Sequence, residues 1–505
     1  MTAQFLPQSL LPGQVRLDYE GGSHLFTRVE PQLSLRDMAV EMQVHRDEEG
    51  HSSLKILVMA EKSRLVSLRL QWNHPVEPHL RFLGDQWGTA KEPLQWRTMD
   101  PCRKFPWYVL MRGSEETTAL GVTTPCAAFA VWSITPRAII LDLDLRNGNR
   151  GVALDGRVLE AATVLHCRYE RTPMAAARRF CALLSPEPIL PNLPVYGFTT
   201  PKDHPEKEEI LSFADTLALA ANGLTNRPFL LLDHRRIPCA TDAEELPALA
   251  EALRERGIRP ALNRRLLATP TEELLSGACR QQAFPESLDP TCPETQEYLE
   301  KQVHLARDWG FDMLGIRNPA SDILHYAQSL PAPWGFHDPG ITNAEILTAF
   351  HSLLRQDMGD LLLYGQDLVG HLAAGLVHIA QTAPMPEGGE PSERIRREIN
   401  ALSFRLCQHG NYFTLAPNPL EISTEASWRH RATTARLFSH VGSAFFVAPE
   451  NPALTANTLH ALAKEFYSAS LGNLQAVPTD WLENTCPELW TLDGAPFPLP
   501  WKELE

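Results

Sequence analysis

The hydrophobic pattern divides the chain into two parts with different periods. Through about residue 175, short runs alternate apolar and polar positions with a period of two, which is typical of half-buried β-strands. Turn signals such as Asn147-Gly148 and Asp155-Gly156 separate the runs. We therefore predict an antiparallel β-sandwich over residues 1–175. Its clearest strands are Ser53–Met59, Leu65–Trp72, Ala128–Ile134 and Ala138–Leu145.

From Val195 onward, apolar runs alternate with amphipathic helical segments, the pattern of a parallel α/β sheet. A helix at Thr172–Leu184 and a proline-rich stretch come before it, and we place a linker at residues 176–194. Eight strands in order predict a (β/α)8 TIM barrel over residues 195–470, followed by a C-terminal extension over 471–505. The strands are Val195–Thr199, Pro228–Leu232, Arg259–Leu262, one ending at Arg317, Leu361–Tyr364, Leu376–Ala380, Tyr412–Leu415 and Ala444–Val447.

Composition narrows the class of partner. The net charge of −15 argues against nucleic acid, and no run of 18 apolar residues is available to span a membrane. The nine cysteines are scattered without a CxxC pair, so we expect no metal site and no cofactor. The N-terminal segment lacks a basic start and an apolar core, which favours a cytoplasmic location, with a secreted or periplasmic one left open if a signal was trimmed. Oligomeric state is also left open.

One segment carries a family resemblance. Trp309-Gly-Phe-Asp312 follows a long helical segment, and a short apolar strand then ends on Arg317. This arrangement resembles the fourth-strand region of the melibiase-like glycoside hydrolases, the α-galactosidase superfamily. The sandwich segment Phe105-Pro-Trp-Tyr108 is similar to theirs as well. The resemblance implies a β-sandwich followed by a catalytic barrel, and the family's C-terminal β-domain is expected to be absent or vestigial here.

The same resemblance exposes departures at the catalytic positions. Arg317 stands where the family has its nucleophilic aspartate, and Gly315 where it has a lysine. Gln381 occupies the position of the family's acid/base residue, and Asn418 lies where the family has its D-P-D motif. Of the two aspartates that end the second strand in the family, Asp233 alone remains. The family mechanism therefore cannot be carried over directly.

A hydrolase still needs a proton donor and, if it inverts configuration, a base that activates water. The candidate catalytic residues are Asp233, Asp338, Gln366 and Asp367, all at expected strand ends or in the loop between strands four and five. Gln366 can orient water but cannot accept its proton, so it would act beside Asp367 or Asp338.

The arginine at position 317 suggests an acidic substrate, because a guanidinium binds a carboxylate in a planar, bidentate way. With Arg264 or Arg265 from the third strand and Arg235 or Arg236 from the second, it would form an arginine cluster that binds a terminal sialic acid, or less favourably a uronic acid. We predict an inverting exo-glycosidase acting on an oligosaccharide or glycoprotein glycan. The candidate substrate-binding residues are Arg317, Asn318, His234, Asn263, Arg264, Gln381, His378 and Trp334.

Two alternatives stay open. The chain could be a catalytically inactive glycan-binding protein on a melibiase scaffold. It could also be a neutral-sugar, α-galactosidase-like hydrolase in which Asp233 and Asp367 form the catalytic pair.

Overall fold

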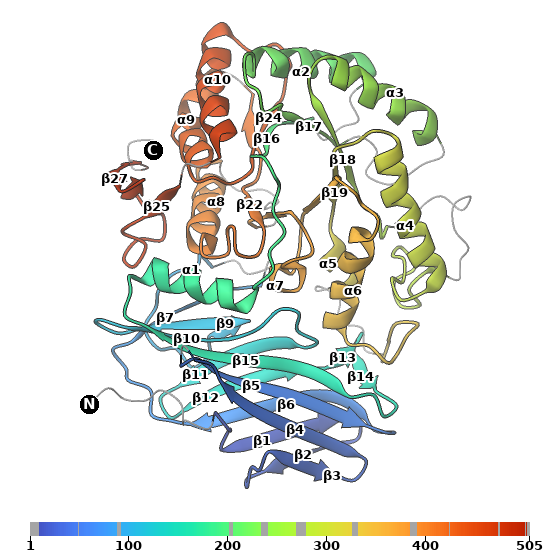
Figure 1. Ribbon diagram of the computed structural model, residues 1–505, viewed down its shortest axis with the longest axis vertical. Helices are drawn as coiled ribbons and strands as arrows, with labels where there is room; N and C mark the ends of the chain where they lie inside the picture. The colour runs from blue at the N-terminus through green and yellow to red at the C-terminus, as the bar shows by residue number, and fades with distance from the viewer. Residues whose placement is uncertain are drawn as a thin grey trace.

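The computed structural model describes residues 10–48, 50–87, 92–200, 206–233, 241–268, 279–325, 332–383, 391–423, 425–472, 475–499 and 501. Its N-terminal part contains two antiparallel sheets, drawn in blue and cyan at the bottom of Figure 1. The first sheet holds β1 (Gln14–Tyr19), β2 (Gly22–Phe26), β6 (Arg64–Asn73), β8 (Lys104–Pro106), β11 (Phe129–Thr135), β12 (Ala138–Asp144), β13 (Arg146–Asn147) and β14 (Arg150–Ala153). The second holds β3 (Gln32–Leu35), β4 (Met38–Arg46), β5 (Ser52–Ala60), β7 (Arg81–Gly84), β9 (Tyr108–Arg112), β10 (Thr117–Val122) and β15 (Leu159–Tyr169).

The period-two pattern explains why these strands form. In β5, Leu54, Ile56, Val58 and Ala60 are all buried, whereas the residues between them are half-exposed. One face of the strand therefore joins the core and the other meets solvent. The sandwich strands predicted from this alternation are confirmed.

The C-terminal part contains one parallel sheet that curls, with helices around it (Figure 1). The strand order is β22-β21-β20-β19-β18-β17-β16-β24-β23. The strands are β16 (Tyr196–Thr199), β17 (Phe229–Leu232), β18 (Arg259–Arg264), β19 (Met313–Ile316), β20 (Leu362–Gly365), β21 (Ile379–Gln381), β22 (Thr414–Ala416), β23 (Leu420–Ile422) and β24 (Phe445–Pro449). The helices are α2 (Lys207–Ala220), α3 (Asp242–Glu255), α4 (Pro293–Asp308), α5 (Pro319–Leu324), α6 (Asn343–Arg355), α7 (Gly370–Ala373), α8 (Pro391–Arg405), α9 (Glu425–His440) and α10 (Ala456–Leu471).

All eight predicted strands are present, in parallel pairs and in chain order. The short strand β23 is additional: a few residues after β22 the chain pairs with β24 in parallel from Leu420 to Ile422. Among the described residues no ladder joins β22 to β23 or β24, so the strand pairing gives a curled parallel sheet rather than a complete ring.

Alternate residues of the parallel strands belong to two separate cores. One residue in two faces the helices, and the others form a compact cluster on the concave side of the sheet. This inner cluster consists of Val195, Phe229, Leu231, Ala261, Met313, Tyr364, Ile379, Ala416, Ala444 and Phe446. At the C-terminal end of each strand, the same alternation decides whether the next polar side chain points to the concave side of the sheet. The region where these ends meet on the concave side is called here the C-terminal edge.

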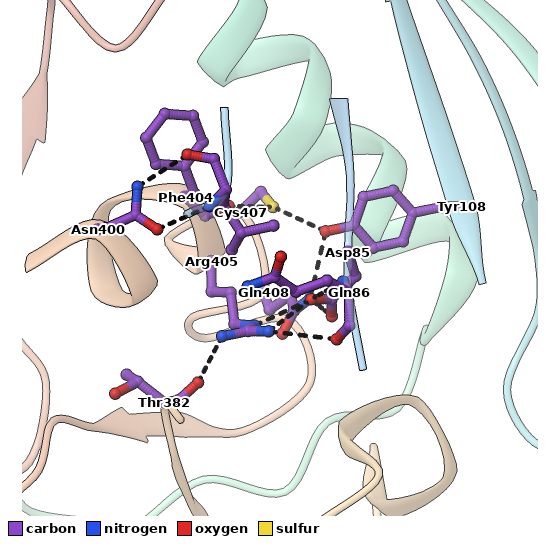
Figure 2. Close-up of polar contacts among 10 residues, drawn as sticks. Asp85, Gln86, Tyr108, Thr382, Asn400, Phe404, Arg405, Cys407 and Gln408 are labelled. Atoms are coloured by element: carbon purple, nitrogen blue, oxygen red, sulfur yellow. Dashed lines mark hydrogen bonds and ion pairs between the residues drawn. The ribbon is translucent and has the colours of Figure 1, made fainter. Parts of the chain in front are cut away.

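The helix α1 (Pro173–Leu184) lies between the sandwich and the parallel sheet (Figure 1). It confirms the helix predicted at Thr172–Leu184 and overlaps the first part of the predicted linker. The C-terminal end of α8 makes a second junction, shown in Figure 2. Arg405 at this end binds the Asp85 carboxylate at 2.8 Å and donates to the Thr382 carbonyl at 2.7 Å. One guanidinium thus ties the sandwich to the residue that follows β21.

After α10 the chain forms a small antiparallel sheet of β25 (Ala476–Pro478), β26 (Trp490–Leu492) and β27 (Ala495–Pro496). Its Trp490 is buried, and Trp481 of the same segment packs edge-on against Trp96. In the part of the chain that the structure describes, no helix is long and apolar enough to cross a bilayer.

Candidate functional site

An ion pair between Asp233 and Arg317 lies at the C-terminal edge. Asp233 directly follows β17 and Arg317 directly follows β19, and both continue the inward alternation of their strands through Leu231 and Met313. The Arg317 Nη1 donates to both Asp233 oxygens, at 2.9 and 3.0 Å. The Asp233 side chain is 6% exposed and that of Arg317 is 22% exposed. The carboxylate is therefore buried beneath the guanidinium.

Asn263, on the intervening strand β18, extends this pair toward β20. Its Nδ2 donates to Asp233 Oδ1 at 3.5 Å and to Gln366 Oε1 at 3.3 Å. Gly315 makes room for it, because a Cβ at that position would lie 2.5 Å from Asn263 Oδ1. A lysine at position 315, as in the melibiase pattern, could not share this space with the asparagine.

Tyr364 places a hydroxyl beneath this group. It belongs to the inner cluster and stacks on Phe446, with ring centroids 6.0 Å apart. Burial raises the pKa of Tyr364 to about 12, and the nearby Gln366 amide and Arg317 charge oppose that rise. The phenol is therefore neutral and available as a proton-bearing polar group at neutral pH.

Asp367 also lies at the end of β20, but its carboxylate turns toward α5. Its backbone is left-handed, with φ of 58°, and its Oδ2 accepts from the Ser321 hydroxyl at 2.6 Å and from the Ser321 amide at 3.1 Å. Burial raises the pKa of Asp367, and the bonds from Ser321 partly offset this. Asn318, the residue before α5, is also left-handed, with φ of 53°, which asparagine tolerates well. Asp367 thus caps the start of α5 and has the raised pKa that a proton donor needs.

A second polar group surrounds Gln381 at the end of β21. Gln381 Nε2 donates to Asn418 Oδ1, and Asn418 Nδ2 donates to the Glu398 carboxylate. The same carboxylate accepts from the Asn418 backbone amide at 3.0 Å and from the Thr382 hydroxyl at 3.3 Å. Burial raises the pKa of Glu398, against the hydrogen bonds from Asn418 and Thr382. Glu398 also lines a pocket between α8 and α9 with Asn418, Arg394 and Arg431.

Glu398 and Tyr364 were not anticipated from the sequence. Glu398 lies inside the amphipathic helix α8, where a glutamate ordinarily faces solvent. Tyr364 looked like one apolar residue of a strand. Only the packing of α8 against the loop after β22 brings Glu398 to Asn418, so no local signal could have indicated it.

Arg264 and Arg265 do not join Arg317 in the predicted arginine cluster, because each is held by its own aspartate. The other two arginines of that prediction, Arg235 and Arg236, lie outside the described residues. Arg264 is on the outward phase of β18, is 2% exposed, and binds Asp242 of α3 at 2.6 Å. Arg265 binds Asp322 of α5 at 2.5 Å. The prediction that Arg264 assists Arg317 therefore finds no geometric support, and strand alternation is the reason.

Three further candidates lie away from the Asp233–Arg317 pair. His378 precedes β21, at the opposite end of the strand from Gln381, and its Nδ1 accepts from the Leu363 amide at 3.0 Å. Trp334 packs against Phe284 and Phe336. Asp338 is exposed in a turn, where it accepts from Gly340 at 2.8 Å.

The loop carrying Trp334 and Asp338 lies against the sandwich. Its backbone bonds to the hairpin of β13 and β14, including Asn149 and Ala153. The last candidate, His234, lies outside the described residues. Within the described residues no group of three potential ligands gathers to hold a metal ion.

Comparison with known proteins supports the fold. No family model and no curated protein matches the chain. Among solved structures, an α-galactosidase from Thermus thermophilus in complex with p-nitrophenyl α-D-galactopyranoside matches with a TM-score of 0.57 and 14% identity, over 92% of this chain and 100% of that chain. A GH36 α-galactosidase from Geobacillus stearothermophilus in complex with raffinose matches with a TM-score of 0.56 and 10% identity, over 95% and 79%.

An α-N-acetylgalactosaminidase from Bifidobacterium bifidum, in complex with GalNAc, matches with a TM-score of 0.57 and 10% identity, over 95% of this chain and 90% of that chain. At these identities the likeness concerns the fold. The architecture is melibiase-like, and the resemblance seen in the sequence is confirmed at that level.

Proposed function

We propose that this protein is a glycoside hydrolase that removes a terminal neutral sugar, an α-galactoside or α-N-acetylgalactosaminide, from an oligosaccharide. The observation that carries the proposal is the set of polar side chains at one edge of a melibiase-like sheet. Asp233, Asn263, Arg317 and Gln366 come from four adjacent strands, and Gln381 from the next. Amides and carboxylates held by neighbouring groups suit sugar hydroxyls, which both donate and accept hydrogen bonds.

We also propose that the curled sheet closes into a (β/α)8 barrel around this site. Eight parallel strands in chain order support closure, as does a bond from the Ala444 amide to the Leu415 carbonyl at 2.8 Å. That bond connects the residue before β24 to β22, across the position where the ladder is interrupted.

A neutral sugar fits better than the acidic sugar favoured from the sequence. The carboxylate clamp required Arg317 to be available, but Asp233 already binds it through both oxygens. A sialic or uronic acid would have to displace that buried carboxylate or approach it at a cost in repulsion. The known complexes with raffinose and GalNAc belong to structures of the same fold.

The chemistry would depend on carboxylates other than the family pair. Asp367 has a raised pKa, as a general acid requires. Gln366 beside it can orient a water molecule, and Asp233, the other carboxylate at the C-terminal edge, would take the proton of that water. Because no carboxylate occupies position 317, a covalent sugar intermediate there is excluded, and inversion by an activated water remains the predicted outcome.

The test is incubation of the purified chain with raffinose, p-nitrophenyl α-galactoside, p-nitrophenyl α-N-acetylgalactosaminide and 3′-sialyllactose, followed by measurement of released monosaccharide. Release of galactose or N-acetylgalactosamine is expected, with proton NMR of the first-formed anomer reporting inversion. Release of sialic acid alone would overturn the neutral-sugar assignment. Binding without release would show a glycan-binding protein instead.

Two variants connect activity to the site. Asp367→Asn should lower kcat by at least about 100-fold if it is the acid. Asp312→Asn is the matched control, because Asp312 pairs with Arg254 and Arg259 before β19, at the other end of the strands. Equal activity of the two variants would remove Asp367 from the mechanism.

A further inference from the structure

We propose that two hydrogen-bond relays, each starting at a carboxylate, fix the amides of Gln366 and Gln381 in opposite orientations. Gln366 then offers N–H donors to the substrate, and Gln381 offers a carbonyl acceptor. This inference rests on the proposed function for its ligand, a neutral sugar, but the relays themselves can be tested without any ligand.

The two glutamines occupy equivalent positions on neighbouring strands. Tyr364 pairs with Ile379 and Gly365 with Ala380, so Gln366 and Gln381 are next in the same parallel register. Adjacent strands lie about 4.8 Å apart, and both residues continue the inward alternation. Each side chain is only partly buried. A sugar at the C-terminal edge would meet the two amides side by side.

The first relay starts at Asp233. An ionised carboxylate can only accept hydrogen bonds, so the Asn263 group that faces Asp233 must be its Nδ2. The same Nδ2 also donates to Gln366, which must turn its Oε1 toward Asn263. Gln366 is therefore left with its Nε2 for other partners. The effect of the amide on Tyr364 agrees, since Gln366 lowers the pKa of that hydroxyl as a donor would.

The second relay starts at Glu398 and ends with the opposite polarity. Glu398 accepts from the Asn418 Nδ2, from the Asn418 backbone amide and from Thr382, so both of its oxygens act as acceptors. The Oδ1 of Asn418 must then face Gln381, and Gln381 donates a hydrogen bond to it through Nε2. The Gln381 Oε1 is left over. Among the described residues nothing binds Gln381 Oε1, and Gln366 Nε2 has the Tyr364 hydroxyl as its neighbour, which leaves a second N–H for the substrate.

The relays differ in how the middle asparagine is used. Asn263 donates in both directions, whereas Asn418 donates in one direction and accepts in the other. In the first relay, the direction of hydrogen-bond donation reverses at Asn263. In the second, donation runs in one direction from Gln381 through Asn418 to Glu398. Two chemically identical side chains become a fixed donor and a fixed acceptor, which would select the orientation of a bound sugar.

The test applies one substitution, glutamine to glutamate, at both positions and measures thermal unfolding at pH 7.5. Gln366→Glu keeps an acceptor toward Asn263 and should change the Tm little. Gln381→Glu places a carboxylate against Asn418 Oδ1 and should lower the Tm by about 2–4 °C more than Gln366→Glu. Equal shifts, or a larger loss for Gln366→Glu, would overturn the relays.

A double variant guards against a nonspecific cause. In Glu398→Gln/Gln381→Glu the carboxylate moves to the other end of the second relay, so Asn418 can turn over and donate to residue 381. The double variant should recover most of the Tm lost by Gln381→Glu. As a control, Gln366→Met removes the amide at the end of the first relay, and Glu398→Gln should not restore the Tm that this variant loses. Additive losses in the double variant would contradict a relay through Asn418.

Ligand binding tests the consequence separately. Calorimetry with monodeoxy and monodeoxyfluoro methyl α-galactosides distinguishes the two contacts, because fluorine cannot donate. The sugar hydroxyl that donates to Gln381 Oε1 should lose about tenfold in affinity whether it is replaced by hydrogen or by fluorine. The hydroxyl that accepts from Gln366 Nε2 should tolerate replacement by fluorine better than by hydrogen. If no galactoside binds the unaltered protein, the proposed function fails, while the Tm asymmetry still decides the relays.

Discussion

The guanidinium of Arg317 lies within 3.0 Å of both carboxylate oxygens of Asp233, so the charge of the arginine that follows β19 is neutralised by the aspartate that follows β17, two strands away. An arginine at this position without Asp233 would be a partly buried cation with no counter-ion. The pair restores local neutrality at the C-terminal edge, and Asn263 and Gln366 are arranged around it.

Breaking this pair should destabilise the protein through the partner left behind. We expect Arg317→Met to lower the free energy of unfolding by about 3 kcal/mol, because Asp233 is buried without its counter-ion. Arg317→Met combined with Asp233→Leu should recover most of that loss. Urea denaturation measures both. Arg254→Ala, which breaks a half-exposed pair with Asp312, is the control and should cost less than about 1 kcal/mol.

Gly315 and Asn263 should behave as a coupled pair. Gly315→Ala introduces a Cβ at 2.5 Å from Asn263 Oδ1, and displacing that amide should cost about 1–3 kcal/mol. Asn263→Ala removes the obstructing atom, so the double variant should lose less than the sum of the two single variants. Chemical denaturation of the full cycle checks this, and strict additivity would show that the two side chains do not compete for space.

Arg405 should connect the sandwich to the C-terminal edge. Arg405→Ala removes its bonds to Asp85 and to the Thr382 carbonyl, shown in Figure 2, and should lower the free energy of unfolding by about 3 kcal/mol. Arg405→Lys keeps the charge but cannot reach both partners, so it should recover only part of the loss. Full recovery by lysine would mean that charge alone, without the bond to Thr382, is what stabilises the junction.

Asp367 should give a measurable pH dependence. Burial raises its pKa above the ordinary value of 3.8, so its protonated form is favoured in the folded state. Its contribution is then present at low pH and is lost as the pH rises through the folded-state pKa. Asp367→Asn should therefore gain stability relative to the unaltered protein between pH 4 and pH 7. Asp308→Asn, at an exposed aspartate, is the control. If the difference in unfolding free energy between Asp367→Asn and the unaltered protein stays constant or falls as the pH rises, the raised pKa is contradicted.

The architecture could be predicted because it depends on local periods. The alternation in β5 and the sequence of apolar strands and helices after Val195 are set by which residues prefer burial. The strand ends could be predicted as well, since polar residues such as Asp233 and Arg317 follow apolar runs directly. The sequence thus determined a β-sandwich, an ordered parallel sheet and the edge at which the candidate site lies.

The partners of those polar residues were decided only by the tertiary structure. Strand alternation alone left open which of Arg264 and Arg265 faces inward, and packing of α3 and α5 supplied an aspartate to each. Glu398 reaches Asn418 because α8 packs beneath the loop after β22, 20 residues away in sequence. Charge pairing and amide orientation depend on contacts between distant segments, and a one-dimensional pattern of hydrophobic and polar positions does not contain those contacts.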